Sequence, residues 1–170
     1  IVIGNNNAIT YKEIFPLIKD NKLWLGFSQP KEFDTPNGMT KKVNGLTRWY
    51  ANVGTKKRHH KLETVYRWHK RKEKYPDLYP KYDNYDAIEV GKVLQIPLDY
   101  DGIMGVPITF LDKFNPDQFE IIGADFDLAK ALTINGKIKP NPQRFYINGK
   151  RKYSRILIKN KHPEDYQNDL

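Results

Sequence analysis

The 170-residue sequence contains no cysteine. This absence excludes a disulfide framework, a thiol nucleophile and every thiolate metal site. No apolar run approaches the roughly 18 residues that a membrane-spanning helix needs. There is also no Walker loop, and neither Ser28 nor Ser154 has the context of a nucleophile elbow. Since 11 Tyr, 8 Phe and 3 Trp argue against disorder, we expect a soluble, cytoplasmic protein.

Acidic residues are nearly missing from two long stretches, because charge is sorted into blocks along the chain. Residues 41–74 hold twelve Lys or Arg against two Glu, a local net charge of +10, and residues 137–161 hold nine basic residues and no acidic one. Residues 75–130 hold eleven Asp or Glu against four Lys, a local net charge of −7. Blocks of one sign focus electrostatic potential over a surface. The pattern predicts a polyanionic partner, and we expect nucleic acid.

The opening run, Ile1–Gly4, is apolar and predicts a buried strand of an α/β sheet. Such a strand needs neighbours on both sides, so we expect that preceding strands have been cut away; a processed or shortened chain is the alternative. A capping box, Thr10–Glu13, flanked by Ile9 and Ile14 as a hydrophobic staple, then predicts the start of a helix. Pro16 should kink this helix or end its first part.

Two further strands are expected at 23–27 and 46–53, separated by a long loop at 29–45. A helix is expected from about residue 60 to residue 74. Its buried stripe is predicted from residues at helical spacing, namely Leu62, Val65, Tyr66 and His69. The remaining face is basic, which fits a solvated surface as well as it fits contact with nucleic acid.

The second half of the chain is expected to be rich in β-structure, with strands at 87–90, 103–111 and 119–126. Asn135-Gly136 and Asn148-Gly149 each stand between apolar residues at hairpin spacing, which predicts tight two-residue turns. The second hairpin is expected to run from 144–147 into 153–159 and to carry the second basic block.

Residues with catalytic chemistry form no strong pattern. The four histidines, at positions 59, 60, 69 and 162, have no spacing that suits zinc, and we assign no metal site. The best acidic candidates for a nuclease are Asp99, Asp101 and Asp112-Lys113, which we interpret as acids in turns around strands.

Asn5, Asn6 and Asn7 directly follow the first predicted strand. In open α/β sheets ligands bind beyond the carboxyl ends of strands, and a side-chain amide can bond a base edge or a polar substrate. Asparagine is equally common in turns. The sequence therefore leaves a pocket-lining role and a turn role open for these residues.

Five stretches carry a family resemblance: Ile3–Phe15, Arg48–Asn52, Tyr79–Val90, Tyr100–Gly123 and Tyr153–Ile158. Together they resemble the EcoRI-type adenine-specific DNA methyltransferases, and the likeness spans nearly the whole chain. The resemblance implies transfer of a methyl group from S-adenosylmethionine to the exocyclic amine of adenine in duplex DNA. The base must be extruded for this reaction, because the amine is engaged in the base pair.

The two signatures of such enzymes are a glycine-rich cofactor loop and an Asn/Asp-Pro-Pro-aromatic loop, and neither is present. Asn115-Pro116 and Asn141-Pro142 lack the second proline and the aromatic residue, so no catalytic residue is assigned. The chain resembles the C-terminal portion of the family. On this interpretation it is inactive alone, and Asn5 to Asn7 lie near the target-base pocket. A restriction endonuclease of the same bacterial system is a possible partner without direct contact.

The expected fold is therefore a truncated S-adenosylmethionine-dependent methyltransferase-like α/β sheet, holding its downstream strands at residues 1–75, followed by a β-rich target-recognition-like region at 76–170. The residues expected to contact DNA phosphates are Lys56, Lys57, Arg58, Lys61, Arg67, Lys70, Arg71, Lys72, Lys150, Arg151, Lys152 and Arg155. Secondary candidates for stacking on bases are Trp49, Trp68 and Tyr82. The competing hypotheses are a non-enzymatic nucleic-acid-binding module and an interaction protein whose acidic and basic segments bind each other.

Overall fold

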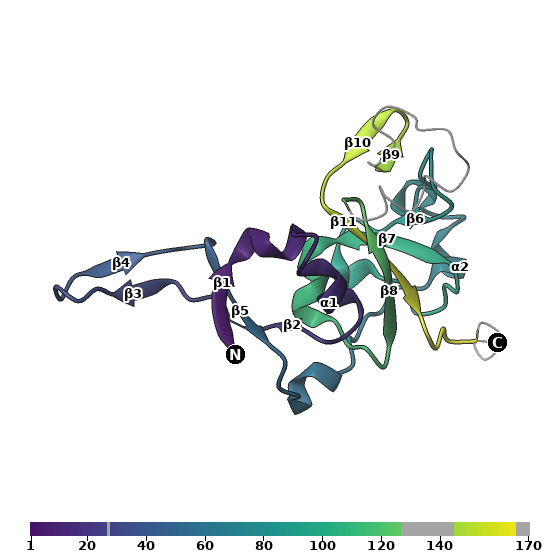
Figure 1. The fold of residues 1–170 in the computed structure, drawn as a ribbon. Helices are drawn as coiled ribbons and strands as arrows, with labels where there is room; N and C mark the ends of the chain where they lie inside the picture. The colour runs from purple at the N-terminus through teal and green to yellow at the C-terminus, as the bar shows by residue number, and fades with distance from the viewer. Residues whose placement is uncertain (27, 127–144, 166–170) are drawn as a thin grey trace. The chain divides into compact units, whose positions relative to one another are not determined.

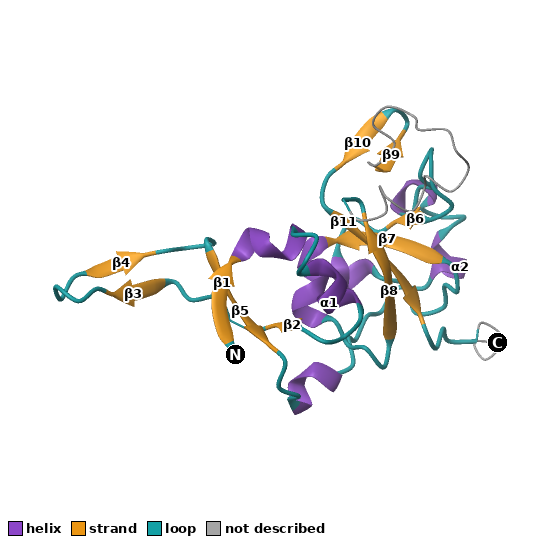
Figure 2. Cartoon of the chain, viewed as in Figure 1, coloured by secondary structure: helices purple, strands orange, loops and turns teal. Residues whose placement is uncertain are grey.

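The structure is a computed structural model of the 170-residue chain, and it describes residues 1–26, 28–126 and 145–165. It divides into two units, Ile1–Lys56 and Lys57–Leu170. The architecture is mixed α/β, rich in strands and with few, short helices in the described residues (Figure 2). No helix among these residues is long and apolar enough to cross a membrane.

The first unit is built on an antiparallel sheet with the strand order β1-β5-β2 (Figure 1). The central strand β5 (Thr47–Ala51) pairs with β1 (Val2–Asn5) on one side and with β2 (Trp24–Leu25) on the other. Tyr50 on β5 is buried, and its hydroxyl donates to the carbonyl of Asn5 at 2.8 Å. The three strands confirm those expected from the sequence.

The expectation that the opening strand is buried is wrong for this unit. Ile1, Val2 and Ile3 are 75%, 61% and 39% exposed. The reason is the strand order, because β1 lies at one edge of the sheet and β5 is its neighbour in it.

The expected capping box does not form. Thr10 lies within a 3-10 helix, η1 (Asn6–Thr10), and its hydroxyl donates to the carbonyl of Asn7 at 2.9 Å. The α-helix begins later, as α1 (Phe15–Lys19), with Pro16 in its first turn. A proline there loses no helical hydrogen bond, so it begins this helix instead of kinking it.

The expected loop at 29–45 contains a hairpin. Strand β3 (Glu32–Asp34) pairs antiparallel with β4 (Thr40–Lys42). Between them the amide of Thr35 donates to the carbonyl of Met39 at 2.8 Å, and Gly38 takes a positive φ of 76°. This left-handed conformation favours glycine and closes the turn.

The second unit is built on a four-stranded sheet with the order β6-β7-β11-β8. Strand β6 (Ile88–Glu89) is parallel to β7 (Ile103–Pro107), and β11 (Arg155–Asn160) runs antiparallel to both β7 and β8 (Phe119–Ala124). Ile156, Leu157 and Ile158 on β11 are fully buried. A run of consecutive buried residues indicates that this inner strand is covered on both faces.

Among the described residues, three short helices precede these strands in the chain and two connect them. They are η2 (Lys56–His59), α2 (Trp68–Arg71), η3 (Pro76–Leu78), η4 (Val93–Gln95) and η5 (Ile108–Lys113). The strands expected at 87–90 and 119–126 are confirmed. The one expected at 103–111 ends at Pro107, where η5 begins.

The long helix expected at 60–74 is wrong, since α2 is its only α-helical part. Leu62 is extended instead, and its amide and carbonyl both bond the side chain of Gln118, at 2.8 and 3.0 Å. Tyr66 forms a parallel bridge with Pro97, and Val65 is 85% exposed. These partners, distant in sequence, satisfy the backbone of 60–67 without a helix. The two compact units divide between residues 56 and 57, and the sequence-based division between 75 and 76 stays a prediction.

The Asn148-Gly149 turn is confirmed. It joins β9 (Phe145–Ile147) to β10 (Lys150–Lys152), and its two residues have φ of 51° and 72°. Positive φ at both positions is typical of a type I′ hairpin turn. The expected second strand, 153–159, is wrong as a hairpin partner, because β11 joins the four-stranded sheet. The Asn135-Gly136 turn lies outside the described residues.

A buried polar cluster connects this hairpin to the sheet. The Glu89 carboxylate accepts from Arg155 Nε at 2.9 and 3.0 Å and from Nη2 at 2.6 Å, and it also accepts from the Tyr82 hydroxyl. Burial, and then the bond to Glu89, raise the pKa of Tyr82. Although burial alone would lower the pKa of Arg155, its bonds to Glu89 raise it. Gly105 faces this cluster, where Tyr82 leaves no room for a Cβ.

We predict that Glu89→Gln destabilises the chain by about 3 kcal/mol or more, because it leaves the guanidinium of Arg155 without its buried counter-charge. Urea unfolding at neutral pH, followed by circular dichroism, measures this loss. Asp86→Asn is the matched control, because Asp86 pairs with Lys81 at 3.5 Å with a side chain that is 96% exposed. An equal loss in both variants would contradict the central role of Glu89.

Candidate nucleic-acid interface

The first basic block, residues 41–74, includes the short helix α2, and a carboxylate from another loop holds the start of this helix. Asp99 accepts from the backbone amides of Trp68 at 2.6 Å and His69 at 3.1 Å, and it also contacts His69 Nδ1. The Asp99 side chain is only 1% exposed. Burial alone would raise the pKa of Asp99, but these hydrogen bonds lower it. Asp99 thus caps the start of α2 from another loop.

Cations and aromatic rings alternate over this segment. Lys72 Nζ lies 4.6 Å from the centre of the Trp68 ring. The Arg71 guanidinium lies 4.7 Å from the ring centre of Tyr66 and 5.5 Å from that of Tyr75. Such contacts hold the side chains in defined positions while their charge stays available to an anion. Trp68 is half-buried and packs against Tyr100 at 5.2 Å, which gives it a structural role.

The other side chains of this block that are expected to contact phosphates differ in their burial and in their partners within the protein. Arg67 pairs with Glu164 at 2.7 Å and is partly buried. Arg58 is also partly buried, and this burial lowers its pKa, an effect that nearby Asp117 opposes. Four lysines of the set are exposed: Lys56, Lys57, Lys61 and Lys70.

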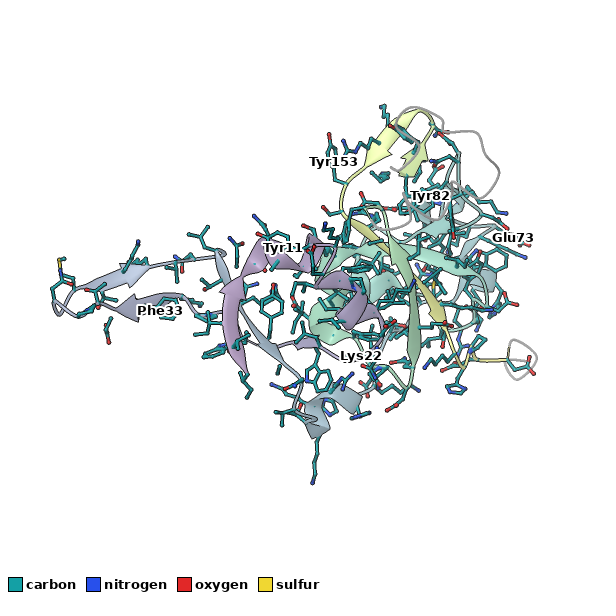
Figure 3. The ribbon with its side chains drawn as sticks, viewed as in Figure 1. Tyr11, Lys22, Phe33, Glu73, Tyr82 and Tyr153 are labelled. Atoms are coloured by element: carbon teal, nitrogen blue, oxygen red, sulfur yellow. The ribbon has the colours of Figure 1, made fainter. Side chains whose placement is uncertain are left out.

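The second basic block stands on the hairpin β9–β10. Lys150 is exposed, whereas Arg151 and Lys152 are half-buried. The Arg151 guanidinium lies 4.4 Å from the ring centre of Tyr153, which is 67% exposed. In Figure 3 Tyr153 points outward beside the hairpin. The hairpin therefore presents a cation and an exposed aromatic ring together.

An acidic residue of the middle block, Asp83, binds the turn of this hairpin through hydrogen bonds. Asp83 accepts from the turn amides of Asn148 at 3.0 Å and Gly149 at 2.8 Å, and its own amide donates to the carbonyl of Tyr146 at 2.8 Å. The strand β9 contributes its apolar side to a buried cluster formed by Tyr82, Ala87, Phe145, Ile147 and Leu157. The hairpin is thus fixed to the sheet of the second unit.

Two residues expected at the interface have other roles. Arg155 is bound to Glu89 and is 17% exposed in its side chain, which gives it a structural partner, and its expected phosphate contact stays a prediction. Tyr82 is buried, with 6% exposure, beneath the hairpin (Figure 3). Its ring packs against Phe145 at 4.9 Å, which excludes stacking on a base without unfolding. Trp49, in the first unit, is half-buried against Gly26.

The three asparagines serve the fold of the first unit in different ways. Asn5 Oδ1 accepts from the amide of Asn7 at 2.8 Å and caps η1. Asn6 Oδ1 accepts from Nε of the buried Arg48 at 2.7 Å. Asn5 thus has a local turn bond, whereas Asn6 binds a side chain of β5; neither bond tests the pocket-lining role. The Asn7 side chain is exposed and stays a candidate for the pocket-lining role.

The described histidines and acids do not come together as a metal centre. His59 Nδ1 lies 2.5 Å from Asp117, and His69 contacts Asp99, but no group of three or more His, Asp or Glu able to hold a metal ion occurs in the described ranges. Sequence reasoning missed the supporting roles of Asp83 and Glu89. Only their place in an acidic block pointed to them, since the hairpin turn and Arg155 lie 65 or 66 residues away from them.

Residues 1–161 match the family described as adenine-specific methyltransferase EcoRI. The chain belongs to this family, which confirms the resemblance drawn from its motifs. It is 42% identical to the type II methyltransferase M.EcoRI of Escherichia coli over 95% of the chain and 50% of that protein. It is 36% and 35% identical to M.MgeORF184P of Mycoplasma genitalium and M.MpnI of Mycoplasma pneumoniae, in each case over 94% of the chain and 56% of the relative.

The chain therefore spans about half the length of the curated relatives it matches. No solved structure shows a significant match to it. The family assignment therefore rests on sequence similarity alone, whereas the basic surfaces described above are observed in the structure.

The described residues do not fit a binding site for S-adenosylmethionine, the methyl donor that the resemblance implies. Gly4 leads from an antiparallel edge strand into a five-residue 3-10 helix, and the adjoining side chains of Asn5 and Asn6 are bonded internally. The parallel strand β6 is followed by Gly91 and by η4, which has only three residues. Neither arrangement gives a glycine-rich turn that opens a helix toward a ligand.

We predict that Asp99→Asn costs about 2 kcal/mol of stability at neutral pH, because the carboxylate accepts charge-assisted hydrogen bonds. The pKa of Asp99 is lowered in the fold below its ordinary value of 3.8, so its contribution is present above that value and is lost as the pH falls through the folded pKa. Urea unfolding from neutral to acid pH tests this. The difference between wild type and variant should shrink at acid pH; a constant difference would assign the loss to packing.

Proposed function

We propose that the chain is the DNA-engaging, C-terminal portion of a site-specific adenine DNA methyltransferase. The complete enzyme transfers a methyl group from S-adenosylmethionine to the exocyclic amine of adenine in duplex DNA, in the cytoplasm of a bacterium. The single observation that carries this proposal is the family match over residues 1–161. The basic surfaces of α2 and of the hairpin β9–β10 supply the physical means of binding the duplex.

In this proposal the described residues bind and orient DNA, and the cofactor and the reacting groups are held by other parts of the enzyme. Phosphates are contacted by side chains of both basic blocks, namely Lys56, Lys57, Arg58, Lys61, Lys70, Arg71, Lys72, Lys150, Arg151 and Lys152. Asn7 faces the extruded target base. A paired restriction endonuclease would recognise the same site without touching this protein.

The geometry of the hairpin supports its role as a DNA-contacting element. Its tip carries Lys150 next to a rigid type I′ turn, which Asp83 holds from the other side. A cation on a pre-organised element loses less conformational entropy on binding than one on a loose loop. The hairpin is therefore suited to set the register of the protein on the duplex.

The polypeptide 1–170 is expected to transfer no methyl group by itself, because its described residues form no cofactor site. Incubation with duplex DNA and S-adenosylmethionine labelled in the methyl group measures transfer directly. The full-length relative M.EcoRI, tested on the same DNA, is the positive control. Label in the DNA incubated with 1–170 would show that the chain is catalytically complete and would refute this division of labour.

The double substitution Lys150→Ala and Lys152→Ala is expected to weaken binding to duplex DNA and to flatten its salt dependence. Each lost phosphate contact lowers the slope of log K against log salt by about 0.9. Titration of a duplex at several salt concentrations gives this slope.

Lys12→Ala and Lys22→Ala together are the matched control for this titration. These lysines are exposed in the first unit and pair with Glu13 and Asp20, both at 3.4 Å. The control has the same loss of net charge, so its slope should stay at the wild-type value. Equal slopes for both double variants would mean that net charge alone governs binding.

A further inference from the structure

A pocket of about 430 Å³ opens between the end of α2 and the 3-10 helix η3. One contiguous stretch of chain forms it, so its shape depends on local structure within the second unit. Its wall contains Tyr66, Arg71, Lys74, Tyr75, Asp77 and Leu78. Its volume falls within the range of pockets for small ligands, roughly 300 to 1,000 Å³.

The chemistry of this wall is that of aromatic rings next to cations. Arg71 lies 4.7 Å from the ring centre of Tyr66 and 5.5 Å from that of Tyr75, and Lys74 Nζ lies 5.6 Å from the Tyr75 ring centre. Tyr75 is 46% exposed although it is a large aromatic residue. The backbone fixes it, since its amide donates to the carbonyl of Arg71 at 2.7 Å and Pro76 follows directly.

A simple phosphate site would need the cations but not the exposed ring. A ring face and a guanidinium plane are the surfaces on which nucleobases stack, and adjacent cations neutralise the phosphate of the same nucleotide. The carboxylate of Asp77 at the wall is an acceptor for an amino group of a base. Together these groups match one nucleotide, with its base, its phosphate and its hydrogen-bonding edge.

A paired base in a duplex offers neither face, because both are covered by its neighbours in the stack. We propose that this pocket binds an unpaired nucleotide of a DNA strand, with the base against Tyr75 and Arg71 and the phosphate at Lys74. This inference rests on the proposed function, in which extrusion of the target adenine creates unpaired nucleotides in the duplex. The pocket would stabilise the opened DNA.

The experiment uses the 170-residue chain and three DNA probes that carry 2-aminopurine, whose fluorescence is quenched by stacking. One probe is a fully paired duplex, one is the same duplex with a single unpaired 2-aminopurine, and one is the single strand. We expect preference for the unpaired probe over the paired one. Tyr75→Ala should reduce this preference about tenfold, as expected for the loss of one stacking contact, and should leave the paired duplex bound as before.

Three variants separate stacking from a structural effect. Tyr75→Phe keeps the ring and should keep the preference, whereas Arg71→Lys keeps the charge but loses the planar surface and should reduce it. Tyr153→Ala is the matched control, because it removes an exposed tyrosine beside an arginine at 4.4 Å elsewhere in the second unit. The inference is overturned if Tyr153→Ala acts like Tyr75→Ala, or if Tyr75→Ala weakens all probes equally.

The probes also keep the two proposals apart. Binding to the paired duplex without preference for the unpaired probe would overturn the pocket and leave the proposed function standing. A different result would support the pocket and contradict the proposed function. In it, the chain quenches the 2-aminopurine fluorescence of the single strand, Tyr75→Ala abolishes this quenching, and the paired duplex is not bound.

Discussion

The buried carboxylate of Glu89 is the constraint on which the second unit depends. A buried charge is stable only when it is paired and hydrogen-bonded, and Arg155 and Tyr82 together meet this requirement. The three residues come from β6, from the start of β11 and from the loop before β6. Their bonds therefore connect the acidic middle of the sequence to the strand that follows the basic hairpin, and they place that hairpin beside the sheet.

The same relation between acidic and basic segments recurs at the other places where the blocks meet. Asp83 holds the turn of the hairpin, Asp99 holds the start of α2, and Asp117 contacts His59. These acidic residues of the middle block, together with Glu89, thus position basic segments inside the second unit. The cations that remain on the surface, such as Lys150 and Lys72, give that surface its positive character. Charge sorting in this sequence therefore reflects the scaffold of the second unit as well as the cations on its surface.

Family membership and geometry contribute different parts of the functional picture. Membership assigns the chain to the adenine-specific EcoRI methyltransferases, although it covers about half of each relative. The geometry adds that the described residues form no cofactor cradle, whereas they form two basic surfaces with aromatic rings next to cations. These two findings support the division between a DNA-engaging part and a catalytic part that the proposed function puts forward.

Features that depend on neighbouring residues could be predicted from the amino-acid sequence. Asn148-Gly149 accepts positive φ at both positions, so the hairpin turn was predictable, and the largely apolar composition of 119–126 indicated the strand β8. The stretches that resemble the methyltransferase family could also be recognised from the sequence alone. The conformation of residues 60–74 depends on tertiary contacts, because the side chains of Gln118 and Asp99 bind its backbone and no long helix forms. Only the tertiary structure gave Arg155 its structural partner, because Glu89 lies 66 residues away. Local propensity is encoded within a few residues, whereas a buried charge takes its role from whichever partner the fold brings to it.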